Sequence, residues 1–315
     1  MLPAAASLEH VSWELPDRIS LREVGPRDGL QNEDPVPTDA KVALLDRLSQ
    51  TGIKRIEAVS FVRPDAIPQM ADADEVWKRA ARAPSVRYSA LVPNLRGALR
   101  ALDAGFTELE AVVSASETHN RKNVNRSTGQ SLDEIAEIIT EAHARDATLQ
   151  VIVSTAWGCP YEGDVPVART VWVAGRAVAD GADSVSFGDT TGMATPTRVR
   201  SLVGAFRSAH PDMALNLHFH NTRGTGLANV LAALELGVAD FDASVGGLGG
   251  CPYAPGATGN IATEELVHMV EDMGVATGVD LEAMIEAAAE AERIVGHTLP
   301  SQVLRAGPRT RTIPA

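Results

Sequence analysis

The feature that most limits the fold of this chain is a regular alternation of short β-rich runs and amphipathic helix patterns. The predicted strands cover residues 19–24, 55–61, 86–92, 108–114, 149–154, 184–188, 214–220 and 240–245. The predicted helices cover residues 39–50, 72–81, 95–104, 132–144, 167–180, 196–210, 227–236, 262–273 and 281–295. Eight strand–helix units in succession are typical of a closed (β/α)8 barrel. We therefore predict an α/β fold, a (β/α)8 TIM barrel with extra C-terminal helices.

An open, doubly wound sheet is the alternative to a closed barrel. It would need a Gly-rich phosphate loop after its first strand, but residues 25–29 read G-P-R-D-G. Glycines follow four of the helix patterns, where left-handed caps are expected, at Gly52, Gly105, Gly181 and Gly237. Predicted helix starts include Thr38, Ser131 and Thr195. No low-complexity linker divides the pattern, so we expect one catalytic domain over residues 18–315 after a loose leader over residues 1–17.

Composition narrows the environment and the partners. The 315 residues carry a net charge of −13, which argues against nucleic acid as a partner, although local arginines can still bind an anionic small molecule. No stretch has the roughly 20 apolar residues of a membrane helix, and residues 1–15 match neither a signal nor a transit peptide. The two cysteines are far apart and give no disulfide framework. We expect a cytoplasmic protein that binds neither nucleic acid nor membrane.

A barrel of this kind carries its functional residues at the carboxyl ends of its strands and in the loops that follow. Polar residues gather there, namely Arg27 and Asp28 after the first strand, residues 114–125 after the fourth, Asp189 after the sixth, His218 and His220 in the seventh, and residues 246–260 after the eighth. Glu57 lies inside the second strand, where an unpaired polar group is costly to bury. A functional role and an interior salt bridge are both open for it.

The H-x-H sequence at residues 218–220 indicates a metal site. His218 and His220 project to the same face of a strand, about 7 Å apart, because side chains alternate between faces. Two imidazoles so placed can converge on one divalent ion, although two unrelated histidines would give the same pattern. Asp28 adds a carboxylate, and this set suits Mg²⁺, Mn²⁺ or a related ion with positions open for substrate. Asn260 could add an amide oxygen, or it could instead cap the helix that follows.

A second unusual segment is the loop G-G-L-G-G-C-P-Y-A-P-G at residues 246–256, whose glycines permit unusual backbone shapes and movement. Cys251 at its tip could swing over the barrel mouth and transfer a proton or act as a nucleophile. A small residue that merely packs is the alternative. Cys159 stands in a similar sequence, G-C-P-Y, but no partner in the sequence supports a reactive role, so we interpret it as structural.

Basic residues also occur at the functional end of the predicted barrel. Arg27 could place a guanidinium against a developing oxyanion, or it could form an ordinary ion pair with Glu57 or Asp189. Residues 121–126, R-K-N-V-N-R, form a basic cluster that could meet a phosphate-bearing substrate. A run of charges is more often a solvated face, so both interpretations stay open.

Taken together, these motifs resemble those of the 3-hydroxy-3-methylglutaryl-CoA lyase family, metal-dependent TIM-barrel lyases related to the condensing synthases. The resemblance covers residues 19–280 and is carried by E-V-G-P-R-D-G-L-Q-N-E (23–33), E-A-V-S-F-V (57–62), V-P-N-L (92–95), A-S-E (115–117), K-N-V-N (122–125), G-C-P-Y-E-G (158–163), G-D-T (188–190), H-F-H (218–220), G-L-G-G-C-P-Y (247–253) and G-N (259–260). The condensing synthases share R-D-G and H-x-H but lack this cysteine loop. Biotin-dependent transcarboxylase relatives use a modified lysine in the barrel, for which these strands offer no candidate.

The resemblance implies retro-Claisen cleavage of 3-hydroxy-3-methylglutaryl-CoA to acetyl-CoA and acetoacetate, with Mg²⁺ or Mn²⁺ as cofactor. The implied metal ligands are Asp28, His218, His220 and Asn260. The implied catalytic residues are Arg27, Asp28, Glu57, Asp189 and Cys251. The residues expected to contact the acyl-CoA substrate are Arg27, Arg121, Lys122, Asn123 and Arg223. The family tends towards homodimers, and the helix after Met273 is a candidate for the interface.

Each catalytic residue has an implied role. Arg27 would stabilise the thioester oxygen as it becomes an enolate, and Cys251 would transfer a proton from a mobile lid. Glu57 and Asp189 would assist proton transfer and orient the metal and the arginine. Which of the carboxylates removes the hydroxyl proton stays open.

The chain departs from the family beside the metal ligands. The family's best-known members read H-C-H-D-T-Y-G where this chain reads H-F-H-N-T-R-G at residues 218–224. Asn221 and Arg223 change charge and shape there, so a lyase for citramalyl-CoA or a longer 3-hydroxy-3-alkylglutaryl-CoA is the alternative. A condensing synthase and a non-catalytic metal-binding scaffold are the rival classes. The scaffold predicts the loss of a ligand, of Arg27 or of Cys251, and all are present.

Overall fold

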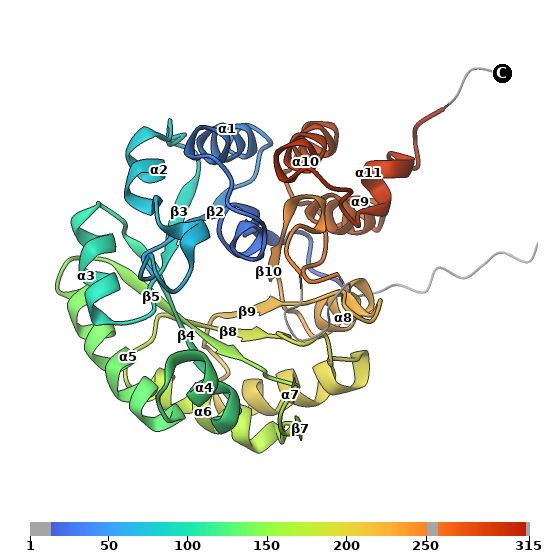
Figure 1. The fold of residues 1–315 in the computed structure, drawn as a ribbon. Helices are drawn as coiled ribbons and strands as arrows, with labels where there is room; N and C mark the ends of the chain where they lie inside the picture. Colours follow the sequence, from blue (N-terminus) through green and yellow to red (C-terminus); the bar gives the residue numbers. More distant parts are fainter. Residues whose placement is uncertain (1–13, 251–257, 313–315) are drawn as a thin grey trace, which may run out of the picture.

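A closed barrel of parallel strands forms the centre of the molecule. The computed structural model describes residues 14–250 and 258–312, and within them eight strands pair in the order β1–β10–β9–β8–β5–β4–β3–β2, with β2 returning to β1 (Figure 1). The strands are β1 (Ser20–Glu23), β2 (Arg55–Ser60), β3 (Arg87–Leu91), β4 (Glu108–Ser114), β5 (Thr148–Ser154), β8 (Ser184–Gly188), β9 (Leu215–His218) and β10 (Asp240–Ala243). The predicted TIM barrel is confirmed. A short antiparallel pair, β6 (Gly158–Cys159) and β7 (Gly163–Asp164), adds to the loop after β5.

Helices surround the barrel and cover its outer face (Figure 1). They are α1 (Thr38–Leu48), α2 (Ala73–Arg79), α3 (Leu95–Asp103), α4 (Glu117–Val124), α5 (Thr128–His143), α6 (Val167–Ala179), α7 (Pro196–Ala209), α8 (Gly226–Leu234), α9 (Thr263–Asp272), α10 (Leu281–Val295) and α11 (Gln302–Ala306). Of the extra C-terminal helices, α10 matches the helix predicted over residues 281–295, and α11 has no counterpart among the predicted ranges. None of these described helices combines the length and the apolar character needed to span a membrane.

One predicted helix start needs correction, and one helix in this part of the chain has no counterpart among the predicted ranges. Ser131 does not start a helix, because α5 begins at Thr128 and Ser127 caps it in a reciprocal capping box with Gln130. Helix α4 was not predicted, because its sequence E-T-H-N-R-K-N-V has no apolar periodicity. Ser116 caps α4 by accepting a hydrogen bond from the His119 N–H, so local capping replaces the missing amphipathic signal.

The predicted left-handed glycines are confirmed at all four positions, with φ of 87° at Gly52, 92° at Gly105, 101° at Gly181 and 72° at Gly237. After Gly105 the Phe106 N–H donates to the Ala101 carbonyl at 3.1 Å, the long bond of a Schellman cap. Gly52 differs because it also lies against another segment. A β-carbon there would come within 2.5 Å of the Gly278 carbonyl oxygen.

The apolar core lies between the outer face of the barrel and the helices. Trp77 of α2 stacks on Phe106 with ring centroids 4.0 Å apart, and Phe187 of β8 meets Phe206 of α7 edge-on at 5.1 Å. The inside of the barrel is different, because charged side chains are buried there. Buried charges need partners, so the interior carries a network of ion pairs.

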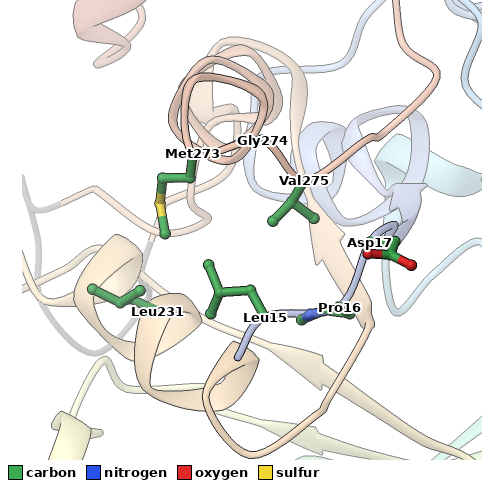
Figure 2. Close-up of a pocket in the computed structure, with 7 residues that line it drawn as sticks. All are labelled: Leu15, Pro16, Asp17, Leu231, Met273, Gly274 and Val275. Carbon is green, nitrogen blue, oxygen red and sulfur yellow. The ribbon is translucent and has the colours of Figure 1, made fainter. Parts of the chain in front are cut away.

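A cavity of about 570 Å³ lies at the amino-terminal end of β1, between the segment Leu15–Asp17, α8 and the end of α9 (Figure 2). Leu15, Leu231 and Met273 line it. Functional residues of a barrel lie at the carboxyl end instead, so this cavity is at the opposite end from Asp28 and the two histidines. The segment before β1 is also tied to the fold, because the Ala276 N–H donates to the Asp17 carbonyl at 2.9 Å.

Gly52→Ala should destabilise the fold more than Gly105→Ala. Both substitutions force a β-carbon into a left-handed conformation, at a cost of about 1–2 kcal/mol. Only Gly52→Ala also meets backbone, because a β-carbon at Gly105 has no atom within 4 Å. Urea unfolding would give the midpoint of each variant. If the dependence of the unfolding free energy on urea is the same as in wild type, a lower midpoint reports lower stability. Equal losses of stability would show that the contact between Gly52 and Gly278 relaxes at no cost.

Candidate active site

The turn after β1 positions Arg27 and Asp28. Residues Gly25–Gly29 form a single π-helical turn, η1, in which the Gly29 N–H donates to the Val24 carbonyl at 3.2 Å. Such turns are rare and frequently occur at functional sites. A β-carbon at Gly25 would lie 2.7 Å from a Glu23 carboxylate oxygen. The close packing of this turn on Glu23 therefore requires glycine.

The end of β9 brings His218 and His220 to Asp28. The Nε2 atoms of the two histidines lie 3.1 Å apart, and His218 Nε2 lies 3.9 Å from Asp28 Oδ2. Ligand atoms of all three residues lie within 4.8 Å of one another. His218 and His220 therefore converge, as the alternation of side chains predicted, and they are not two unrelated histidines.

Asn260 joins this group through main-chain pairing. The loop after β10 returns beside the end of β9, where His220 and Asn260 form an antiparallel bridge. The Asn260 Nδ2 amide donates to Asp28 Oδ2 at 2.8 Å and to the Leu248 carbonyl at 3.0 Å. Because both partners are acceptors, the side-chain atom that contacts them must be the amide nitrogen, which donates. Its Oδ1 is buried without a hydrogen-bond partner among the described residues. The alternative role of Asn260 as a helix cap is wrong, because Ala262 occupies the cap position of α9.

The electrostatics of the group suit a cation. Burial alone would raise the pKa of Asp28, but Arg27 and the two histidines lower it to about 2. Burial and the neighbouring His218 lower the pKa of His220 to about 3. Metal ligands must be deprotonated. A carboxylate, a neutral imidazole and an unpartnered amide oxygen are therefore ready to accept a divalent ion.

Arg27 pairs with the carboxylates on either side of it. Its Nη1 lies 2.7 Å from Asp28 Oδ1 and its Nη2 lies 2.7 Å from Glu57 Oε2. The predicted ion pair with Glu57 is therefore present, and Glu57 is fully buried. The register of β2 against β3 shifts between Glu57 and Val59, as a bulge would produce. Burial raises the pKa of Glu57, with Arg27 acting in the opposite direction.

Asp189 lies at the end of β8, beside the histidines. Its N–H donates to the His218 carbonyl at 2.8 Å, and its Oδ1 accepts hydrogen bonds from the Met193 and Ala194 N–H groups. Its Oδ2 is buried without a hydrogen-bond partner among the described residues. Burial raises the pKa of Asp189 to about 7, against the two N–H donors that lower it. One carboxylate oxygen is thus positioned by backbone while the other is available.

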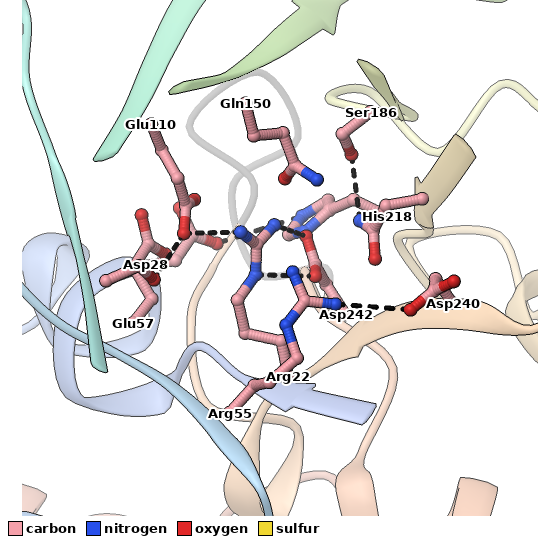
Figure 3. Close-up of polar contacts among 12 residues, drawn as sticks. Arg22, Asp28, Arg55, Glu57, Glu110, Gln150, Ser186, His218, Asp240 and Asp242 are labelled. Carbon is pink, nitrogen blue, oxygen red and sulfur yellow. Dashed lines mark hydrogen bonds and ion pairs between the residues drawn. The ribbon is translucent and has the colours of Figure 1, made fainter. Parts of the chain in front are cut away.

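Charged residues that sequence reasoning missed lie directly beneath the site (Figure 3). Arg22 of β1 forms ion pairs with Glu110 of β4 and Asp242 of β10, and Asp242 Oδ2 lies 3.2 Å from His218 Nδ1. Arg22, Glu110 and Asp242 are buried, and His218 is partly buried. A signal was available, because Arg22, Glu110 and Asp242 stand inside strand patterns as Glu57 does. The sequence does not show which of them meet across the barrel.

Two further buried acids hold the loops that carry the site. Glu23 accepts hydrogen bonds from the Gly25 and Val245 N–H groups, both at 2.8 Å, and Glu264 accepts one from the Gly246 N–H at 3.0 Å. Burial raises the pKa of both carboxyl groups to about 7. Glu23 therefore anchors η1, and both acids anchor the start of the glycine-rich loop.

Three of the residues expected to contact substrate lie further out. Arg121, Lys122 and Asn123 are exposed on α4, where Arg121 pairs with Glu117 at 2.8 Å and the Lys122 ammonium lies 4.9 Å from the Tyr161 ring centroid. Cys251 lies in residues 251–257, outside the described residues. Cys159 is buried, with its sulfur 2.9 Å from the Ser116 hydroxyl, as expected of a structural cysteine.

The two departures beside the histidines both bond to backbone. Asn221 Oδ1 accepts a hydrogen bond from the Gly226 N–H at the start of α8, at 3.1 Å. Arg223 Nη1 donates to the Thr191 and Gly192 carbonyls, at 2.6 and 3.1 Å. Arg223 therefore joins the loop after β9 to the loop that contains Asp189, and its contact with substrate stays a prediction.

Comparison with known proteins agrees with this geometry. The sequence model of the HMGL-like family matches residues 18–290. The hydroxymethylglutaryl-CoA lyase YngG of Bacillus subtilis is 45% identical over 92% of this chain and 97% of its own length. The cytoplasmic 3-hydroxy-3-methylglutaryl-CoA lyase of Mus musculus is 44% identical over 93% of this chain and 85% of its own length.

A solved structure is similar as well. The structure of an HMG-CoA lyase from Acinetobacter baumannii, in complex with coenzyme A and 3-methylmalate, has a TM-score of 0.90 and is 44% identical. The match covers 95% of this chain and 98% of that one. The chain thus belongs to the HMGL-like family and is a carbon–carbon lyase of the hydroxymethylglutaryl-CoA lyase type, so the resemblance predicted from its motifs is confirmed.

Glu264→Gln should make stability less dependent on pH. A buried acid whose pKa is raised by folding does not lower the stability of the fold at pH values below its unfolded pKa, about 4.3. Its full destabilising effect is present once the pH has risen through its folded pKa. Wild type therefore loses stability between about pH 5 and pH 8, by on the order of 3 kcal/mol for this group. The melting temperature of the variant should exceed that of wild type by a few degrees more at pH 8 than at pH 5. Exposed Glu137→Gln is the control, and an equal offset at both pH values for Glu264→Gln would contradict the raised pKa.

Proposed function

We propose that this chain is a divalent-metal-dependent lyase that cleaves 3-hydroxy-3-methylglutaryl-CoA to acetyl-CoA and acetoacetate. The observation that carries the proposal is the convergence of Asp28, His218, His220 and Asn260 at the carboxyl end of the barrel. Membership of the lyase family supports the same reaction.

The four converging residues would hold the ion. One carboxylate, two imidazoles and one amide oxygen suit Mg²⁺ or Mn²⁺, with positions left for substrate oxygens. When bound, the ion acts as a Lewis acid that lowers the pKa of the tertiary hydroxyl of the substrate. The buried Asn260 Oδ1 supports this assignment, because a buried acceptor without a partner is costly unless something binds it.

The remaining steps fall to side chains of the chain. Removal of the hydroxyl proton lets a carbonyl form, the neighbouring C–C bond breaks, and its electron pair moves into the thioester as an enolate. Arg27 stabilises the enolate oxygen, and its buried Nε–H has no acceptor among the described residues. Cys251 takes part in proton transfer, which must end with protonation of the enolate carbon to give acetyl-CoA.

Asp189 is the stronger candidate for the base that removes the hydroxyl proton. One of its oxygens accepts two backbone hydrogen bonds while the other has no partner among the described residues. Glu57 Oε1 is also buried without a hydrogen-bond partner among the described residues, but Glu57 Oε2 forms an ion pair with Arg27 at 2.7 Å. We assign Glu57 to holding the Arg27 guanidinium in place.

The acyl-CoA would enter over α4. Arg121, Lys122 and Asn123 are exposed there and are suited to the phosphate-bearing end of coenzyme A. At the other end of the substrate, Asn221 and Arg223 bond to backbone of the chain itself. This favours 3-hydroxy-3-methylglutaryl-CoA over a related thioester, because Asn221 and Arg223 have hydrogen-bond partners within the chain and do not require a different acyl group as a partner.

Turnover measured by mass spectrometry tests the proposal. Protein loaded with Mg²⁺ or Mn²⁺ is given 3-hydroxy-3-methylglutaryl-CoA and, separately, citramalyl-CoA, and acetyl-CoA and the ketoacid are followed. We expect rapid acetoacetate release that a chelator abolishes and that Cys251→Ala slows by about 10²-fold or more, the usual contribution of a positioned proton-transfer group. Turnover of citramalyl-CoA alone would show that the enzyme is specific for that thioester instead. No turnover of either substrate by metal-loaded protein would refute the assignment.

The cellular context is also a proposal. We place the enzyme in the cytoplasm, the location named for the mouse relative. We propose residues 18–315 as one catalytic domain and residues 1–17 as a leader whose last residues, Leu15–Asp17, contact that domain. We propose a homodimer in which α10, after Met273, contributes to the interface. Small-angle scattering at micromolar concentration should give the mass of two chains, and a monomer would refute the dimer.

A further inference from the structure

The register of three neighbouring strands places a buried charge pair beside a metal-ligand histidine. Arg22 of β1 is the lateral partner of Asp242 of β10, and Asp242 is the lateral partner of His218 of β9. These strands are adjacent in the barrel but far apart in sequence. Arg22, Asp242 and His218 therefore form a row across the inside of the barrel (Figure 3).

Contacts within the row are specific. Arg22 Nε donates to Asp242 Oδ1 at 2.9 Å and Arg22 Nη2 donates to Oδ2 at 2.8 Å, a bidentate pair. The same Oδ2 lies 3.2 Å from His218 Nδ1. Arg22 and Asp242 are each 2% exposed. The carboxylate is held on both oxygens and cannot rotate away without breaking a buried ion pair.

This arrangement decides which nitrogen of His218 carries its proton. An ionised carboxylate accepts hydrogen bonds and donates none, and Arg22 holds Asp242 in that form. His218 Nδ1 must therefore be the donor. In the neutral ring this leaves the lone pair on Nε2, the atom that faces His220 and Asp28.

The opposite tautomer would harm the site. A proton on Nε2 would point at the other ligand atoms and block coordination. A partner that fixes the tautomer and orientation of a ligand histidine typically changes metal affinity by 10–100-fold. A merely structural ion pair would leave metal affinity unchanged once the protein has folded.

We propose that Asp242, clamped by Arg22, is a positioning residue that presents the lone pair of His218 Nε2 to the metal. The inference rests on the metal site of the proposed function. It adds two residues, on β1 and β10, that do not touch the metal or the substrate.

Asp242→Asn tests the proposal, with Asp240→Asn as the matched control. Asp240 stands on the same strand two residues away, and it pairs with a different arginine, Arg55, at 3.2 Å. Mn²⁺ affinity of the full chain is measured by electron paramagnetic resonance, with melting temperatures to confirm folding. Asp242→Asn should bind Mn²⁺ 10–100-fold more weakly, and Asp240→Asn should bind it within about twofold of wild type. Equal affinity of the folded Asp242→Asn variant would overturn the proposal.

A second measurement needs no folded Asp242 variant. Long-range ¹H–¹⁵N NMR of metal-free wild type with ¹⁵N-labelled histidine reports the tautomer of each neutral ring, and a His218→Gln variant assigns the signal. We expect His218 Nδ1 to carry a proton, and a ring whose Nδ1 is unprotonated would overturn the proposal. Failure of wild type to bind Mn²⁺ would instead remove the proposed function, whatever the tautomer.

Discussion

The structure depends on the pairing of two buried guanidinium groups with the acids inside the barrel. Arg22 binds Glu110 and Asp242, and Arg27 binds Glu57 and Asp28. Removing one partner of such a pair leaves an uncompensated buried charge, which costs about 3–5 kcal/mol. These pairs therefore hold the strands in register, and they also fix the side chains that form the site. Stability and function share the same contacts in this part of the molecule.

Main-chain pairing completes what the ion pairs begin. The loop after β10 returns to the end of β9 and places Asn260 against Asp28. Glu23 and Glu264 hold the two loops from behind with hydrogen bonds to backbone N–H groups. These contacts thus position the parts of the site that come from β1, β9 and the described residues of the last loop. Such preorganisation is what electrostatic catalysis requires, because groups aimed in advance need not reorganise during the reaction.

Much of this was readable from the sequence, for physical reasons. Strand and helix patterns have distinct periods, and the functional residues of a barrel lie at one end, so the sequence is enough to group Asp28, His218 and His220. The π-helical turn at Gly25–Gly29 and helix α4 could not be predicted, because neither has apolar periodicity. The roles of Arg22 and Asp242 depend on the pairing of the first strand with the last. That pairing follows from closure of the barrel, and the sequence of either strand alone does not determine the exact register.

Asp28, His218, His220 and Asn260 are proposed to hold one divalent ion together. Crystals grown with Mn²⁺ and measured at the manganese absorption edge would show whether they do. The geometry described here predicts one anomalous peak within coordination distance of Asp28, both histidines and Asn260 Oδ1. An ion bound elsewhere, or no peak between these four residues at saturating Mn²⁺, would contradict it.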